Sequence, residues 1–61
     1  MNLNKRYTVV LDKNGVEERI DVANSKAIAH GVFEVQSVQP GVFSAELIDN
    51  KTGQVIRKVG G

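Results

Sequence analysis

The 61-residue sequence contains no cysteine and no tryptophan, and has only one proline, one tyrosine and two phenylalanines. Without cysteine the chain has no disulfide, no thiolate metal ligand and no cysteine nucleophile. A chain of this length buries only about 60% of the surface that its unfolded form exposes, so its core must hold without cross-links or use a partner's surface. The sequence predicts one small, marginally stable domain over residues 1–61, with residues 1–5 disordered and residues 60–61 flexible.

The chain also lacks a charge of one sign and a long apolar run. Its 8 basic and 7 acidic residues give a net charge of +1, without the dense basic stripe and interleaved aromatics of a nucleic-acid module. Weak nucleic-acid binding through Lys5, Arg6, Arg57 and Lys58 is therefore a minor alternative. No segment approaches the ~20 apolar residues of a membrane span, and the first residues do not resemble a signal peptide. We expect a cytoplasmic protein with no membrane partner.

Residues that could carry catalysis are sparse and scattered. His30 is the only histidine, and no carboxylate pattern marks a partner for it or a metal site around it. No base is placed beside a serine, and a domain this small seldom encloses a substrate pocket. We expect no enzymatic activity, no cofactor and no metal. The groups considered and set aside are Ser25, Ser37 and Ser44 as nucleophiles and Glu17, Glu18 and Asp21 as paired carboxylates.

A first strand pair is predicted on either side of Asn14-Gly15. Residues 6–12 alternate apolar and polar side chains, which is the period of a half-buried strand. Asn-Gly is typical of the two-residue type I′ turn, which fixes the register of a hairpin. The expected opposing pairs are Tyr7 with Val22, Val9 with Ile20, Val10 with Arg19 and Leu11 with Glu18.

A helix is predicted between the two strand pairs. Asn24 or Ser25 can cap it, and Gln39-Pro40-Gly41 ends it. Residues 32–38 could instead form a strand, because they are rich in valine and Gly31 costs a helix interior ~1 kcal/mol. Alternation there divides neither face cleanly, so the helix is favoured. The expected core-facing stripe is Ala27, Ile28, Gly31, Val32, Val35 and Val38, with Lys26, His30, Glu34 and Ser37 largely opposite.

A second strand pair is predicted around the turn at Asn50-Lys51-Thr52-Gly53. Residues 42–49 alternate at the strand period, and Lys51-Thr52-Gly53 suits a three-residue hairpin loop with the glycine in a left-handed conformation. This register brings aliphatic and opposite-charge residues face to face. The expected pairs are Ala45 with Val59, Glu46 with Lys58 and Ile48 with Ile56.

Together these elements predict an α+β fold with the element order ββαββ. Two hairpins joined through one helix close most simply as a four-stranded, mostly antiparallel sheet in the order 2-1-4-3, with the last strand parallel to the first and the helix on one face. An all-β five-stranded small barrel is the alternative. The expected sheet core facing the helix is Tyr7, Val9, Leu11, Ile20, Val22, Phe43, Ala45, Leu47, Val55 and Val59.

The face of the sheet away from the helix is the first candidate interaction surface. Val10, Ile48 and Ile56 are expected to lie on neighbouring strands there, and an apolar centre inside a polar rim is typical of a protein-binding site. Isolated aliphatics in strands also occur simply because β-branched residues favour the pleated backbone. The polar rim is expected to contain Thr8, Arg19, Glu46 and Lys58.

The outward side of the helix is a second candidate. Phe33 is expected there beside Lys26, His30 and Ser37, and an exposed phenylalanine could anchor a partner. The alternative is that Phe33 tucks under the turn at residues 39–41, or that its segment is a strand and its ring is in the core.

The ββαββ order and the terminal sequence Arg57-Lys58-Val59-Gly60-Gly61 resemble the β-grasp family of ubiquitin-like modifiers and sulfur carriers. In that family a C-terminal diglycine is adenylated and then joined to an amine or converted to a thiocarboxylate. The resemblance implies that Gly61 would be the activated residue, that Gly60 would keep the tail slim, and that the aliphatic face would be the recognition surface.

The layout is also similar to that of very short bacterial and phage proteins with two hairpins around a helix, some of which inhibit a host enzyme. The leading hypothesis is therefore a non-enzymatic binding module, an accessory or inhibitory factor or a homodimer, acting through the open sheet face. Its expected contact residues are Val10, Arg19, Phe33, Glu46, Ile48, Ile56 and Lys58.

Overall fold

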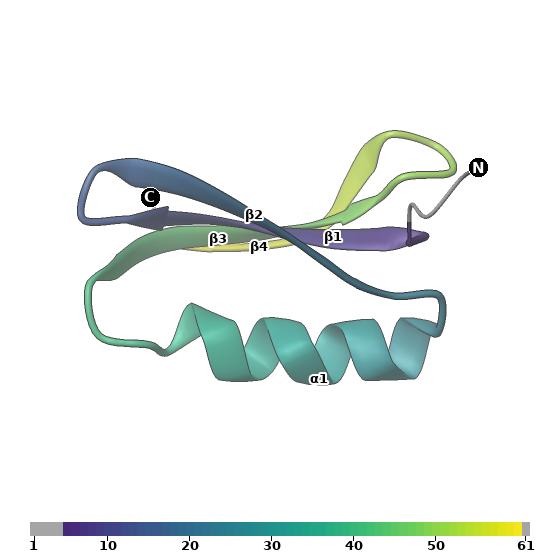
Figure 1. Cartoon of the computed structure of the whole chain (residues 1–61), viewed down its shortest axis with the longest axis horizontal. Helices are drawn as coiled ribbons and strands as arrows, with labels where there is room; N and C mark the ends of the chain where they lie inside the picture. The colour runs from purple at the N-terminus through teal and green to yellow at the C-terminus, as the bar shows by residue number, and fades with distance from the viewer. Residues whose placement is uncertain (1–4, 61) are drawn as a thin grey trace.

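The computed structural model describes residues 5–60, which form a four-stranded sheet with one helix against one of its faces (Figure 1). The chain thus has the predicted α+β class and ββαββ order, and the barrel alternative is wrong. The expectation for residues 1–5 lies almost entirely outside the described residues. The elements are β1 (Tyr7–Lys13), β2 (Val16–Ala23), α1 (Lys26–Ser37), β3 (Val42–Asp49) and β4 (Gln54–Gly60).

The first hairpin has nearly the predicted register. Asn14 and Gly15 have φ values of 54° and 83°, as a two-residue type I′ turn requires. The register shifts only between Tyr7 and Thr8, so Tyr7 lies opposite Ala23 instead of Val22. The remaining predicted pairs are Val9 with Ile20, Val10 with Arg19 and Leu11 with Glu18, and all three are observed.

The strand order is β2-β1-β3-β4, and every neighbouring pair is antiparallel. The predicted order 2-1-4-3, with its parallel first and last strands, is wrong. The turn after α1 brings the chain directly to the free edge of β1, where the N–H of Asn14 donates to the Gly41 carbonyl at 3.0 Å. Since β3 starts at this contact, it takes the position beside β1, and β4 follows as a hairpin at the edge.

Helix α1 begins at a side-chain cap. Ser25 has extended backbone dihedrals, and its hydroxyl accepts from the Ile28 N–H at 3.5 Å, a long contact. The helix runs through residues 32–37, so the strand alternative for this segment is wrong. It packs mainly on β1, β2 and β3, whereas β4 is the edge strand beyond β3.

The side of α1 that faces the sheet is not the predicted one. Ala29 and Phe33 are fully buried, whereas Ile28, Val35 and Val38 are 57%, 58% and 78% exposed. The predicted core stripe therefore points to solvent except for the half-buried Val32. The prediction that Phe33 lies outward is wrong as well, because its ring is the largest fully buried side chain.

Volume complementarity explains this choice of side. The core between helix and sheet includes two alanines, Ala29 and Ala45, which leave room for one large ring. Phe33 fills that space, and the smaller branched side chains of the other stripe would leave a void. Partly buried residues pack around this core, namely Ile20, Val22, Val32 and Val42. The buried core is Tyr7, Val9, Leu11, Ala29, Phe33, Ala45 and Leu47.

The second hairpin differs from its predicted register between its turn and a bulge, and it follows the predicted register on the other side of that bulge. Asp49 lies opposite Gln54, so the loop is residues 50–53 and the predicted three-residue loop is wrong, although Gly53 has the expected positive φ of 79°. Ile48 therefore lies opposite Val55 and not Ile56, and the register shifts between Leu47 and Ile48. Glu46 with Lys58 and Ala45 with Val59 are paired as predicted. Three residues expected in the core are exposed: Phe43 on β3 at 67%, and Val55 and Val59 on β4 at 47% and 38%. Val55 is exposed because its pairing with Ile48 places it on the face away from the helix, and Val59 because it lies on the edge strand.

Gly60, expected in a flexible end, is the last residue of β4 and lies opposite Ser44. Its φ is 76°, and a Cβ there would collide with the backbone carbonyl oxygen of Phe43. This position therefore requires glycine for both its conformation and its close approach to β3. Gly61 lies outside the described residues.

Candidate functional site

The open face of the sheet brings several predicted contact residues together. Arg19, Val10, Glu46 and Lys58 lie opposite one another in a row that crosses all four strands. In an antiparallel sheet such directly opposed residues share a face, so the row carries a half-buried valine between charged neighbours. The structure thus places the predicted rim charges beside Val10.

The next row supplies the remaining aliphatic residues of this face. Ile48 lies between Thr8 on β1 and Val55 on β4. Ile56, predicted to complete the patch opposite Ile48, lies at the bulge and is 37% exposed. The apolar centre of the open face is therefore formed by Val10, Ile48 and Val55, with the half-buried Val10 and Ile48 in adjacent rows.

Ion pairs occupy the charged positions of the open face. Lys58 Nζ lies 3.7 Å from Glu46 Oε2, and Arg19 Nη1 lies 3.6 Å from Glu17 Oε2. Both pairs are solvated, and exposed pairs of this kind contribute little to stability. These charges are therefore available to reorganise around a partner.

A hollow of about 290 Å³ opens between the first hairpin and β3, and its polar lining is acidic. Asp12, Glu17 and Glu46 contribute carboxylates, and Ser44 contributes the only hydroxyl. The single histidine lies elsewhere, since His30 is on α1 and its Nδ1 is 3.4 Å from Arg57 Nη1. The serine of the hollow and the histidine are thus on opposite faces of the sheet. Within residues 5–60, no three His, Cys, Asp or Glu side chains are grouped as metal ligands.

Arg57 links the uncovered strand β4 to the helix. Its Nη1 donates to Glu34 Oε2 at 2.8 Å, and its guanidinium lies 4.8 Å from the centre of the Phe33 ring. A cation over an aromatic face is attracted by the ring quadrupole. Arg57 therefore joins the edge strand β4 to both Glu34 and Phe33 of α1.

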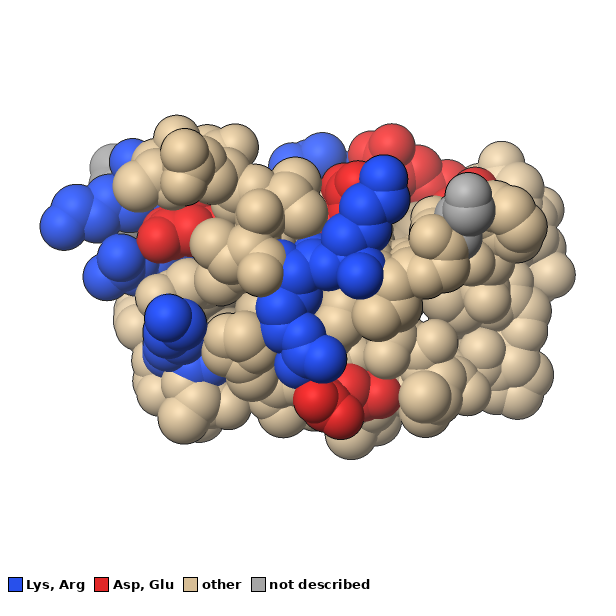
Figure 2. All heavy atoms as spheres, turned by 180° about the vertical axis from the view of Figure 1, so that it is seen from behind, with Lys and Arg blue, Asp and Glu red and all other residues tan. Residues whose placement is uncertain are grey.

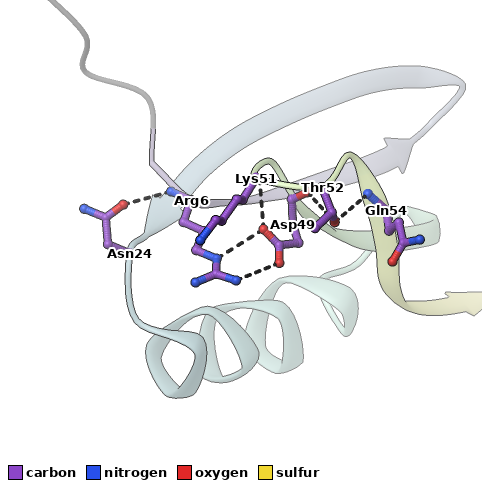
Figure 3. Close-up of polar contacts among 6 residues, drawn as sticks. All are labelled: Arg6, Asn24, Asp49, Lys51, Thr52 and Gln54. Carbon is purple, nitrogen blue, oxygen red and sulfur yellow. Dashed lines mark hydrogen bonds and ion pairs between the residues drawn. The ribbon is translucent and has the colours of Figure 1, made fainter.

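Basic side chains gather at the end of the molecule that holds the β3–β4 turn, and Figure 2 shows several of them on the face seen from behind. Arg6 and Lys51 come together there because both contact Asp49 (Figure 3). The Lys5 carbonyl is joined to the same turn, accepting from Asn50 Nδ2 at 2.9 Å. Two of the residues considered for nucleic-acid binding, Lys5 and Arg6, lie in this cluster.

Asp49 organises this end of the molecule. Its carboxylate accepts from Arg6 Nε and Nη2 at 3.2 and 3.1 Å and from the Lys51 N–H at 3.0 Å. The hydrogen bond from Arg6 holds the pKa of Asp49 below its usual range, against the opposing effect of burial. The same hydrogen bond raises the pKa of Arg6. The Arg6 N–H also donates to Asn24 Oδ1 at 2.8 Å, which ties the chain before α1 to this cluster (Figure 3).

The outward side of α1 forms the most continuous apolar surface on the helix. We define the outer stripe as Ala27, Ile28, Gly31, Val35 and Val38. These positions recur at helical spacing, all five are exposed, and none is charged. The sequence does contain the signal for this stripe, but periodicity alone assigned it to the core.

No protein-family model, curated protein or solved structure matches the chain. In the part of the chain that the structure describes, the helix is too short to cross a membrane. The surfaces described above are therefore the basis on which a function can be proposed.

Proposed function

We propose that this protein is a small non-enzymatic module that binds another protein, as an accessory or inhibitory factor or through self-association. The supporting observation is the outer stripe, where Ile28, Val35 and Val38 are all more than half exposed. A contiguous apolar strip on a small domain is typical of an interaction site.

Flanking polar side chains give this surface the composition of an interface. Glu34 lies on one side of the outer stripe and is paired with Arg57 from β4. An apolar centre desolvates on binding, whereas charged groups at its rim influence partner choice and association rate. The outer stripe with Glu34 and Arg57 at its border is therefore the primary contact surface in this proposal.

The test compares the affinity of a partner protein for wild type and for a double variant of the outer stripe. The wild-type chain is used to capture a partner from the source organism, and the purified partner is titrated by calorimetry against wild type and Ile28→Lys/Val35→Lys. We expect at least a tenfold loss of affinity with an unchanged circular dichroism spectrum, because two charges would be buried in the contact. Unchanged affinity in the folded variant would rule out the outer stripe as the contact.

The open sheet face is the second candidate surface, favoured by the adjacent Ile48 and Val55 with the Lys58–Glu46 pair at their border. Ile48→Lys tests it against the outer stripe in the same titration. A loss of binding confined to Ile48→Lys, in a chain that still folds, would move the contact to the sheet.

The carrier alternative gains no support from the position of Gly60. A carrier would present its terminal residues to an activating enzyme, whereas Gly60 is packed against Phe43 and Ser44 within β4. Release of that residue would require the end of the strand to open.

A further inference from the structure

Helix α1 is apolar on two opposite sides. Its inner side contributes Ala29 and Phe33 to the core, and its outer stripe faces solvent without a charged residue. An apolar stripe on a helix normally packs against another element. The sheet covers only the inner side, and within residues 5–60 Figure 1 shows α1 as an outer layer with no other element beneath it.

We propose that the outer stripe packs against the outer stripe of a second copy of this chain, as an antiparallel helix pair that crosses at Gly31. The inference rests on the proposed protein-binding function and names the partner and the geometry of that same surface. It makes the chain a two-fold symmetric dimer in which both sheets lie outside and both helices lie at the centre.

Gly31 is the position that permits a close crossing. A Cβ built there meets nothing within 4 Å, so the monomer itself has no steric need for a glycine at this position. Its backbone φ also lies outside the left-handed region. Glycine in a helix interior is unfavourable, so an exposed helical glycine without a conformational role suggests close approach by another backbone.

The spacing of the outer stripe fits a second copy of itself. Ala27 and Val35 lie four residues before and four residues after Gly31. A two-fold axis through Gly31 therefore places Ala27 of one copy opposite Val35 of the partner, and the same contact recurs on the other side. Small against large is the complementarity that lets facing helices interdigitate.

The ends of α1 favour the antiparallel orientation. The first turn contains no acidic residue and the last turn no basic one, so no charged side chain of the helix compensates either end of its dipole. An antiparallel neighbour places its carboxyl end beside the amino end of the first helix. The net charge of +1 per chain adds little repulsion between copies.

The size of the contact sets the expected strength. A helix of 12 residues is about 18 Å long, and one such helix per copy makes an interface below the standard size of stable complexes. We therefore expect a reversible dimer with a dissociation constant of roughly 10–100 μM.

Sedimentation equilibrium of the full chain at increasing concentration tests the dimer. The weight-average mass of wild type should rise from 6.6 kDa towards twice that value. Gly31→Lys should stay at the monomer mass while its melting temperature is maintained or raised, because the new side chain enters open space in the monomer. Gly31→Ala is the matched control and should weaken the dimer less than Gly31→Lys does.

Single cysteines test the geometry, since the natural chain has none. Under oxidation Gly31→Cys should cross-link to itself. A mixture of Ala27→Cys and Val35→Cys should give the mixed dimer in excess over either self-dimer, because only an antiparallel pair brings these two positions together.

A monomer mass at every concentration would overturn the proposed dimer, and so would a dimer that persists in both Gly31→Lys and Val35→Lys. Cross-linking of Val35→Cys only to itself would overturn the antiparallel arrangement. If the chain is monomeric but a purified partner requires Ile28 and Val35 for binding, the proposed function stands and only the self-pairing fails. If neither contact is found, both proposals fail.

Discussion

The inner and outer sides of α1 are both apolar, yet only one of them is in the core. The inner side has two fully buried residues, Ala29 and Phe33, and the outer side has three aliphatic residues that are more than half exposed. A count of apolar residues would favour the outer side. Side-chain shape therefore determines which side of α1 packs on the sheet, because one large ring beside two alanines fills the space between the layers.

Among substitutions on the two sides of α1, Phe33→Ala should lower the free energy of unfolding most. Removal of a fully buried phenylalanine typically costs about 3–5 kcal/mol, which approaches the whole stability expected of a domain this small. Urea denaturation followed by circular dichroism should show a largely unfolded chain. A midpoint close to that of wild type would mean that α1 does not depend on its inner side for docking.

Ala29→Leu should destabilise the fold by about 1–3 kcal/mol, because a larger side chain must be accommodated where no space remains. Ala27→Leu adds the same group on the outer side and serves as the matched control. The free energy of unfolding from denaturant titration should fall for the first variant and change little for the second. Equal losses would show that the two sides of α1 are packed alike.

Gly31→Ala should stabilise the monomer by about 0.8–1.0 kcal/mol through its higher helix propensity. The space around Gly31 accepts the added methyl group without contact. Gly15→Ala offers the contrasting control, since its φ of 83° is unfavourable for alanine. Thermal melts of dilute samples compare the two, and a lower melting temperature for Gly31→Ala would contradict an open outer side.

Ile28→Ala should have the smallest effect, within about 0.5 kcal/mol of wild type, because exposed substitutions away from special features change stability little. Ile28 is 57% exposed in the monomer. The measurement is chemical denaturation at protein concentrations below about 1 μM. This is far below the dissociation constant expected for the dimer, so self-association contributes little. A loss above 1 kcal/mol would place Ile28 in the folded core after all.

The parts of the fold that local chemistry determines could be predicted from the sequence. The type I′ turn at Asn14-Gly15 sets the first hairpin, and its register departs from the prediction only at Tyr7. The helix and a cap at Asn24 or Ser25 were also predicted, since capping depends on neighbouring residues, and Ser25 is the residue that caps it. Strand order was not, because the contact between Asn14 and Gly41 that brings β3 to β1 joins residues far apart in sequence.

The candidate surface was predicted only in part. The row from Arg19 through Val10 and Glu46 to Lys58 follows from strand alternation and is present. The β3–β4 loop is one residue longer than predicted, which places Val55 instead of Ile56 opposite Ile48, and the bulge between Leu47 and Ile48 then returns the strands to the predicted pairs. The outer stripe was hidden because helical periodicity identifies an apolar side without saying whether the core can use it.

The central position of β1 has a consequence for synthesis of the chain. One edge of β1 pairs with β2, the next strand to be made, but its other edge pairs with β3, which begins about 30 residues after β1 ends. At translation rates of about 5–20 residues per second, that edge stays unpaired for seconds. The domain therefore completes its core only after β3, which contributes Ala45 and Leu47, has been synthesised, and truncation within β3 should leave a hairpin without a stable fold.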